Sequence, residues 1–329
     1  ALTTVPEGLF AKNTKAKEFG RCFKECTALT TVPAVLFANN TKATNFGGCF
    51  KECTALTTVP AVLFASSTRA ENFSACFQSC TALATVPGEL FANNTQAKGF
   101  SYCFYGCTAL TTLPEGLFAN NKYIESFSNS FNYCKNLTTV PEKLFANNTL
   151  VTDFTYCFAY CMALPTVPGE LFANNTLVKD FGSCFIKCTS LTTLPKGLFA
   201  KNTEVTDFGL CFNDCEALAT VPEGLFATNT KATTFENCFF SCTNLTLNEY
   251  IFVDKNQSYM NRLNRFKDQK MNFHSCFRNV GKNSTKAGKA PDLWNYTGNE
   301  DWNIMACFKD CRMLNNGDVP KNGDWGPTL

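Results

Sequence analysis

One segment of this sequence, residues 49–60, recurs with a fixed period of 27 residues. Each copy begins with a Cys-Phe dipeptide, except the fifth, which begins with Ser130. The leading cysteines are Cys22, Cys49, Cys76, Cys103, Cys157, Cys184, Cys211 and Cys238. A period of this length indicates a repeat architecture, because one such unit cannot bury its own apolar face without stacking on neighbours. The sequence therefore predicts one repeat solenoid rather than a globular domain.

A single repeat contains three short structural signals. Residues 29–32 and 43–46 are β-prone runs, and Pro33 ends the first of them because it lacks a backbone donor. Residues 49–53 place two cysteines and a phenylalanine at i, i+1 and i+4, which is the spacing of one side of a helical turn. We therefore expect two short parallel strands and one short helical turn in each repeat.

Phenylalanine supports the stacking of repeats. Three series start at Phe10, Phe19 and Phe23, and each has nine members, so that they account for 27 of the 33 phenylalanines. Stacked repeats place each series in a ladder whose neighbouring rings are about 5 Å apart, the spacing of adjacent strands. These three ladders are the predicted core.

The regular spacing fails after Thr243, although residues 273–277 and 304–308 still carry the pattern. All three tryptophans, Trp294, Trp302 and Trp325, lie in this last part. A solenoid needs a cap that covers its final turn and blocks edge pairing. We therefore predict a nine-turn solenoid over residues 1–246, followed by degenerate turns and a C-terminal cap over residues 247–329.

The first residue, Ala1, already stands inside a repeat, since residues 1–5 match residues 28–32. An unfinished first turn indicates a processed or truncated product. It also offers a surface for end-to-end contact with another molecule.

Charge and motif content exclude several functions. Lys and Arg total 29 and Asp and Glu total 27, so the chain has no basic footprint for nucleic acid and no polybasic membrane patch. No apolar run approaches the length of a membrane span, so we expect no membrane insertion. His274 is the only histidine and has no nucleophile or acid motif around it. We therefore expect no enzyme activity and no cofactor.

The 20 cysteines leave two interpretations open. Nine Cys-x-x-x-Cys pairs account for 18 of them, while Cys134 and Cys276 stand alone because Ser130 and Val280 occupy the partner positions. One disulfide per pair is the first interpretation, but an i, i+4 pair has poor disulfide geometry on a helix. Buried free thiols that act as small hydrophobic residues are the second, which we favour. The spacing and the scarcity of histidine argue against a metal site.

The motif Cys49-Phe50-x-x-Cys53-x-x-Leu56, followed by Val59-Pro60, resembles the turns of BspA-like leucine-rich repeats. Cys53 and Leu56 stand where that family has Cys and Leu, and Cys49 replaces a small residue. The resemblance implies an α/β repeat solenoid with leucine-rich-repeat-like parallel β-strands and short helical turns. It also implies a bacterial surface or secreted protein of the adhesion type, with no catalytic residues.

Tyrosine is the most informative residue type for function. Six of the nine tyrosines fall between positions 102 and 160, and five of these stand at −1, +2 or +3 relative to the first cysteine position of their turn. These five are Tyr102, Tyr105, Tyr133, Tyr156 and Tyr160. Such positions lie opposite the core positions 0, +1 and +4, so the five rings should be exposed on three adjacent turns. Tyrosine is common on binding surfaces, although variation at tolerant positions also explains the cluster.

These observations predict an extracellular or cell-surface protein that presents a repeat scaffold to a glycan or protein ligand. The alternative is a passive structural spacer or stalk without a ligand of its own. The spacer predicts no preferred face, and the tyrosine cluster argues against it.

Overall fold

The computed structural model describes residues 2–286, 288–296 and 299–311, so Ala1 and Trp325 lie outside these ranges. The chain forms two compact units, Ala1–Ala163 and Leu164–Leu329, which we call unit 1 and unit 2. The helices of the described residues are short and all belong to unit 2. They are α1 (Tyr259–Leu263) and the 3-10 helices η1 (Leu293–Asn295) and η2 (Asn299–Asp301). The predicted division into residues 1–246 and a cap over residues 247–329 stays a prediction.

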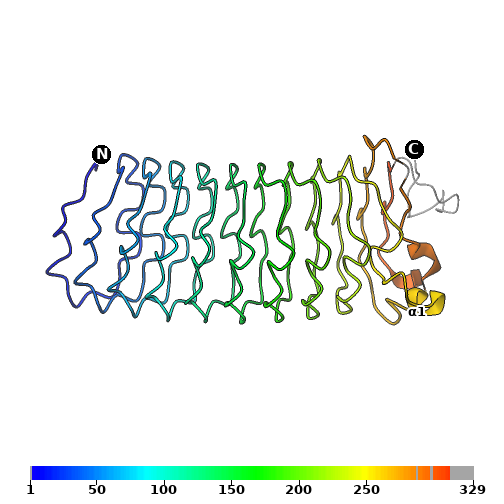
Figure 1. The fold of residues 1–329 in the computed structure, drawn as a ribbon, viewed down its shortest axis with the longest axis horizontal. Helices are drawn as coiled ribbons and strands as arrows, with labels where there is room; N and C mark the ends of the chain where they lie inside the picture. The colour runs from blue at the N-terminus through cyan, green and yellow to red at the C-terminus, as the bar shows by residue number, and fades with distance from the viewer. Residues whose placement is uncertain (1, 287, 297–298, 312–329) are drawn as a thin grey trace. The chain divides into compact units, whose positions relative to one another are not determined.

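Successive turns lie side by side within each unit (Figure 1). Isolated parallel β-bridges join them at one position of every turn, and in unit 1 these bridges run from Glu18 through Asn45, Asn72, Gly99 and Ser126 to Asp153. A second row joins Thr112 to Thr139 in the same register. The parallel direction and the 27-residue register are therefore as predicted. The predicted strands do not form in the described residues, because β-pairing there is confined to single residues.

The predicted helical turn at residues 49–53 is wrong. Gly48 and Glu52 both have a φ of 62°, and the amides of Cys49 and Cys53 donate to the carbonyls of Phe46 and Phe50, three residues back. A left-handed residue at the third position of such a turn is type II geometry. Two tight turns therefore replace one turn of helix.

Alternate backbone donors of this segment reach the next turn, whereas the Lys51 amide donates within its own turn to the Gly48 carbonyl at 3.1 Å. The amides of Gly48, Phe50 and Glu52 donate to the carbonyls of Ser74, Cys76 and Gln78 at 2.7–2.8 Å. Because these acceptors lie 26 residues away in the sequence, no local pattern predicts them. Cys49, Phe50 and Cys53 are nevertheless fully buried, so the predicted core positions are correct although the predicted conformation is not.

The three phenylalanine ladders are confirmed. In unit 1 the series from Phe23 to Phe158 has ring centroids 5.3–5.7 Å apart, with interplanar angles of 10° or less. In unit 2 the same series continues from Phe185 to Phe308 at 5.3–5.7 Å. Rings of different series meet edge to face, as Phe37 and Phe46 do at 4.9 Å. Offset stacking and edge contacts are the favoured aromatic geometries.

A buried asparagine ladder runs beside the rings, and sequence analysis missed it. In unit 1 the Nδ2 of Asn121 donates to the carbonyls of Phe91 (3.1 Å) and Asn94 (2.9 Å) in the preceding turn. Serine replaces asparagine once, where the Oγ of Ser67 donates to the Asn40 carbonyl at 3.2 Å. The second asparagine of the Asn-Asn segments thus satisfies backbone groups of another turn.

In unit 2 the ladder ends at an arginine. The Nη2 of Arg265 donates to the carbonyls of Phe226 (3.2 Å) and Asn229 (2.8 Å), which are the same acceptors that an asparagine of a regular turn would take. Burial lowers the pKa of this guanidinium to about 10. The irregular part of the chain therefore completes the polar ladder with a different side chain.

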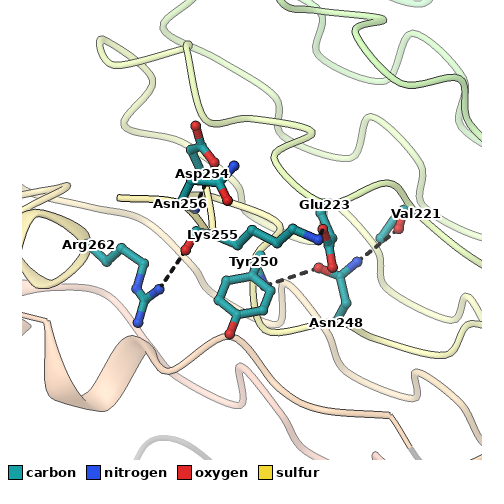
Figure 2. Close-up of polar contacts among 8 residues, drawn as sticks. All are labelled: Val221, Glu223, Asn248, Tyr250, Asp254, Lys255, Asn256 and Arg262. Atoms are coloured by element: carbon teal, nitrogen blue, oxygen red, sulfur yellow. Dashed lines mark hydrogen bonds and ion pairs between the residues drawn. The ribbon is translucent and has the colours of Figure 1, made fainter. Parts of the chain in front are cut away.

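Polar contacts hold the first irregular segment to the last regular turn of unit 2 (Figure 2). Asn248 donates from Nδ2 to the Val221 carbonyl at 2.8 Å, and Lys255 pairs with Glu223 at 2.7 Å. Arg262, on α1, donates from Nη1 to the Lys255 carbonyl at 3.1 Å. Asn248 and Lys255 therefore join this segment to the last regular turn, and Arg262 holds α1 to the segment itself.

Deleting residues 55–81 from unit 1 is expected to leave a folded protein that is one turn shorter. The deletion joins Thr54 to Ala82, which restores the Thr-Ala junction of a normal repeat, and each turn contacts only its neighbours. Circular dichroism and cooperative thermal unfolding of the shortened chain would test this. Loss of all cooperative unfolding would contradict the repeat architecture.

Candidate functional site

The cysteines do not form a reactive site. All 20 are free thiols, and the second cysteine of a turn donates its S–H to the preceding turn, as Cys53 does to the Phe23 carbonyl at 3.0 Å. Ser130 replaces a cysteine and bonds similarly, from its Oγ to the Phe100 carbonyl at 3.0 Å. Burial raises the pKa of Cys53 and of Cys134 to about 12. These thiols therefore stay protonated and pack as small side chains.

Thiol titration of the denatured, non-reduced protein is expected to find close to 20 free cysteines. In the native protein Cys22 should react first with iodoacetamide, because it is exposed whereas most of the others are buried. Peptide mapping after brief native alkylation would identify the modified residue. A titre near two would instead show nine disulfides.

The five predicted tyrosines all belong to unit 1 and reach its surface to different extents. Tyr102 is 41% exposed, whereas Tyr105, Tyr133, Tyr156 and Tyr160 are half-buried. Tyr102 is therefore exposed as expected, and the other four rings are only partly exposed. Packing of tyrosine rings against one another covers part of their surface.

Four of these rings form one continuous row across three turns, which we call the tyrosine strip (Tyr102, Tyr105, Tyr133 and Tyr160). Centroids of Tyr102 and Tyr105 are 5.8 Å apart, and those of Tyr105 and Tyr133 are 5.6 Å apart. Tyr133 and Tyr160 stack at 4.2 Å with an interplanar angle of 14°. Among the described residues, Tyr156 has no ring contact with the strip. Asn129 holds the equivalent position in the turn between Tyr102 and Tyr156.

Left-handed backbone, not a helix, positions most of these rings. Tyr102, Tyr133, Tyr156 and Tyr160 have φ between 56° and 61°. The left-handed region is open to Gly and is tolerated by Asn and Asp, whereas other residues adopt it at a cost of about 1–2 kcal/mol. Gly48 and Asn129 occupy the position of Tyr102 and Tyr156 in other turns, and Ser79 and Gly106 occupy that of Tyr133 and Tyr160. The backbone therefore does not require tyrosine at any of them.

The surroundings of the tyrosine strip are polar and largely uncharged. Asn132 donates from Nδ2 to Asn129 Oδ1 at 2.8 Å, and Asn129 donates to Ser128 Oγ at 3.0 Å. The ammonium of Lys135 lies 5.5 Å from the Tyr133 ring centroid. Burial, together with Tyr133 and Tyr102, raises the pKa of the Tyr105 phenol, which therefore stays neutral at physiological pH.

A hollow of about 680 Å³ lies on the first three turns of unit 1, and sequence analysis missed it. Its lining includes Arg21, Gly48, Lys51, Asn72 and Gln78. Small residues make room for it, because Gly48 and Ala75 hold the position that Tyr102 holds in the fourth turn. The change from small residues to tyrosine at one repeat position was the available sequence signal.

Two other kinds of site are absent from the residues that the structure describes. Those residues contain no group of three or more His, Cys, Asp or Glu side chains arranged to hold a metal ion. The helices within the same ranges are too short and too polar to span a bilayer.

No protein-family model matches the chain, and no curated protein matches it. Solved structures are similar in fold. A chain of the Toll–Spatzle complex from Drosophila matches 79% of this chain at 18% identity with a TM-score of 0.41, and this chain covers 39% of its length. A leucine-rich repeat protein from Bacteroides ovatus matches 86% of this chain and 85% of its own at 18% identity, with a TM-score of 0.35.

A leucine-rich cell surface protein from Faecalibacterium prausnitzii matches 70% of this chain and 80% of its own length, at 16% identity and a TM-score of 0.27. The matched structures include bacterial leucine-rich repeat proteins, and every TM-score is below 0.5. Membership of the BspA-like family is not confirmed by it. The chain is thus similar to leucine-rich repeat proteins. The evidence for its repeat fold comes from its own stacked turns.

Proposed function

We propose that the protein is an extracellular or cell-surface binding protein whose ligand contacts the tyrosine strip of unit 1, with Tyr156 beside it. The observation that carries this proposal is the continuity of the strip across turns four to six. Ring contacts of 5.8, 5.6 and 4.2 Å join residues from three repeats at positions where the backbone does not require tyrosine. Large, rigid rings give much contact area for little lost side-chain entropy.

The adhesion role and the BspA-like resemblance fit this proposal. A repeat scaffold holds its surface side chains at fixed spacings, so a ligand meets a preorganised surface and its binding orders few side chains. The alternative, a passive spacer, does not explain a row of packed rings on one face. The following test would favour the spacer if the proposal is wrong.

Replacing the four left-handed tyrosines with asparagine and Tyr105 with glutamine, as in the third turn, is expected to abolish ligand binding while the protein stays folded. Lost ring contacts cost about 0.5–1.5 kcal/mol each, and asparagine suits the left-handed backbone better than tyrosine does. Thermal unfolding and binding to an array of glycans and matrix proteins would be measured for both proteins.

The matched control is Tyr123→Asn, which removes a tyrosine that is 47% exposed but stands outside the −1, +2 and +3 positions. It should bind like the native protein. Equal binding by the native and five-residue variants, or no binding by either, would favour the spacer.

A further inference from the structure

The tyrosine strip and the hollow belong to one face of unit 1. Positions −4, −2, −1, +2 and +3 of each turn form this face, which we call the outward face. In the first three turns positions −4, −2, −1 and +2 line the hollow, and in turns four to six positions −1, +2 and +3 carry the strip. A ligand lying across the turns would meet both in succession.

Across turns three to five the outward face has no charged side chain. Its residues there are Asn72, Ser74, Ala75, Gln78, Ser79, Gly99, Ser101, Tyr102, Tyr105, Gly106, Ser126, Ser128, Asn129, Asn132 and Tyr133. Charged side chains of this face lie in the turns on either side. Lys24 pairs with Glu25 at 2.6 Å and Lys51 with Glu52 at 3.6 Å, Glu18 accepts from Asn45 at 2.7 Å, Asp153 accepts from Ser126 at 2.9 Å, and Arg21 lines the hollow. Amides, hydroxyls and aromatic rings without net charge suit a ligand that is itself a neutral polyol.

The face is also periodic. Stacked rings of the series from Phe23 to Phe158 place neighbouring turns 5.3–5.7 Å apart. One hexose in an extended β1,4-linked chain advances the polymer by nearly the same distance. Successive sugars would therefore meet successive turns, and alternate sugars would present the same edge to the protein, because each β1,4 link turns the next ring over.

Resting on the proposed function, we propose that the ligand is a neutral, linear β1,4-linked polysaccharide that lies across the turns of unit 1, about one sugar to a turn. The amide of Gln78 faces its hydroxyl groups in the hollow. Asn45 and Asn72 form the floor there, because Asn72 Nδ2 donates to Asn45 Oδ1 at 3.0 Å and Asn45 Nδ2 donates to Glu18 at 2.7 Å. The accessible ring edges and hydroxyl groups of the tyrosine strip contact its sugar rings, since the stacked faces of Tyr133 and Tyr160 cover each other. Glycines in turn two and an alanine in turn three have no large side chain, so the hollow is deep enough for the polysaccharide.

An extended peptide fits this face less well. It advances about 3.3 Å per residue, so its side chains fall out of register with turns spaced 5.3–5.7 Å apart. Added-strand pairing also needs free backbone donors. Here the amides of Tyr102 and Gly106 donate to the carbonyls of Ser128 and Asn132 at 3.0 and 2.7 Å.

Titration calorimetry with β1,4-linked gluco-, manno- and N-acetylglucosamine oligosaccharides of two, four and six units tests the proposal. At least one series is expected to bind with an affinity that rises with length up to six units, while α1,4-linked maltohexaose does not bind. The double variant Tyr133→Asn/Tyr160→Asn should bind the six-unit oligosaccharide about tenfold more weakly or worse. Tyr123→Asn should change that affinity by less than about twofold. If that double variant misfolds, a second variant tests the hollow. Lys51→Ala/Gln78→Ala should remove the increase in affinity between the four-unit and six-unit oligosaccharides.

Three results would overturn the proposal. The first is that no β1,4-linked series binds. The second is that affinity does not depend on oligosaccharide length, and the third is that neither the strip variant nor the hollow variant changes the affinity. If a protein on the array binds and the five tyrosine substitutions abolish that binding, the polysaccharide inference fails while the proposed function stands. If nothing on the array and no oligosaccharide binds, both fail.

Discussion

Phe127→Ala is expected to lower the free energy of unfolding of unit 1 by about 3–5 kcal/mol. The ring is fully buried, and its centroid lies 4.5 Å from that of Phe145, 4.8 Å from Phe118 and 5.8 Å from Phe154. Neighbouring rings of three turns surround it and are held by their own ladders. They cannot collapse into the space, so a cavity is left.

Urea unfolding followed by circular dichroism would measure this loss, and hydrogen exchange would locate it. Because each turn contacts mainly its neighbours, exchange should increase most in the turns that contain Phe118 and Phe145. Tyr123→Ala is the control in the same turn, since that side chain is 47% exposed and should change stability by about 0.5 kcal/mol or less. A loss below about 1 kcal/mol for Phe127→Ala would contradict the packed aromatic core.

Asn121→Asp is expected to destabilise unit 1 by about 2–5 kcal/mol at pH 7, although the two side chains have nearly the same shape. The native Nδ2 donates to two carbonyls, at 3.1 Å from Phe91 and 2.9 Å from Asn94, in a fully buried position. A carboxylate has no donor for either carbonyl and loses its hydration there. Burial therefore raises the pKa of the introduced carboxyl in the folded state.

The sign of the pH dependence follows from that raised pKa. The folded variant binds a proton more tightly than the unfolded chain, so its stability falls as pH rises through the range above the unfolded value of about 3.9. The deficit relative to the native protein should shrink below about pH 4. Denaturant unfolding at pH 3.5 and pH 7 would show this.

Two controls separate the buried ladder from the surface. Asn120→Asp changes the exposed neighbour, which makes one hydrogen bond to the Ala92 carbonyl at 2.9 Å, and should cost about 1 kcal/mol or less. Asn121→Ser copies the residue that the ladder already contains at Ser67 and should cost less than the aspartate. Equal stability of the Asn120 and Asn121 aspartate variants would show that the ladder has no structural role.

The sequence alone determined the register and the core of this protein. A strict 27-residue period places Phe23, Phe50 and Phe77 in line, and the structure has them stacked at 5.3 and 5.6 Å. It also separated outward positions from buried ones, which is why Tyr102 and Tyr160 could be assigned to one surface. Periodicity predicts these features because every turn repeats the same burial pattern.

The tertiary structure alone decided the backbone conformation and the geometry of the candidate site. The amide of Phe50 donates to Cys76 in the next turn, so the segment needs no helix, and a left-handed residue such as Glu52 costs less than an unpaired backbone group would. Asn121 points inward because the carbonyls that it satisfies belong to the preceding turn. The 4.2 Å stack of Tyr133 on Tyr160 likewise depends on two turns meeting. Partners 26–30 residues away leave no local signal in the sequence, and so only the stacked turns reveal them.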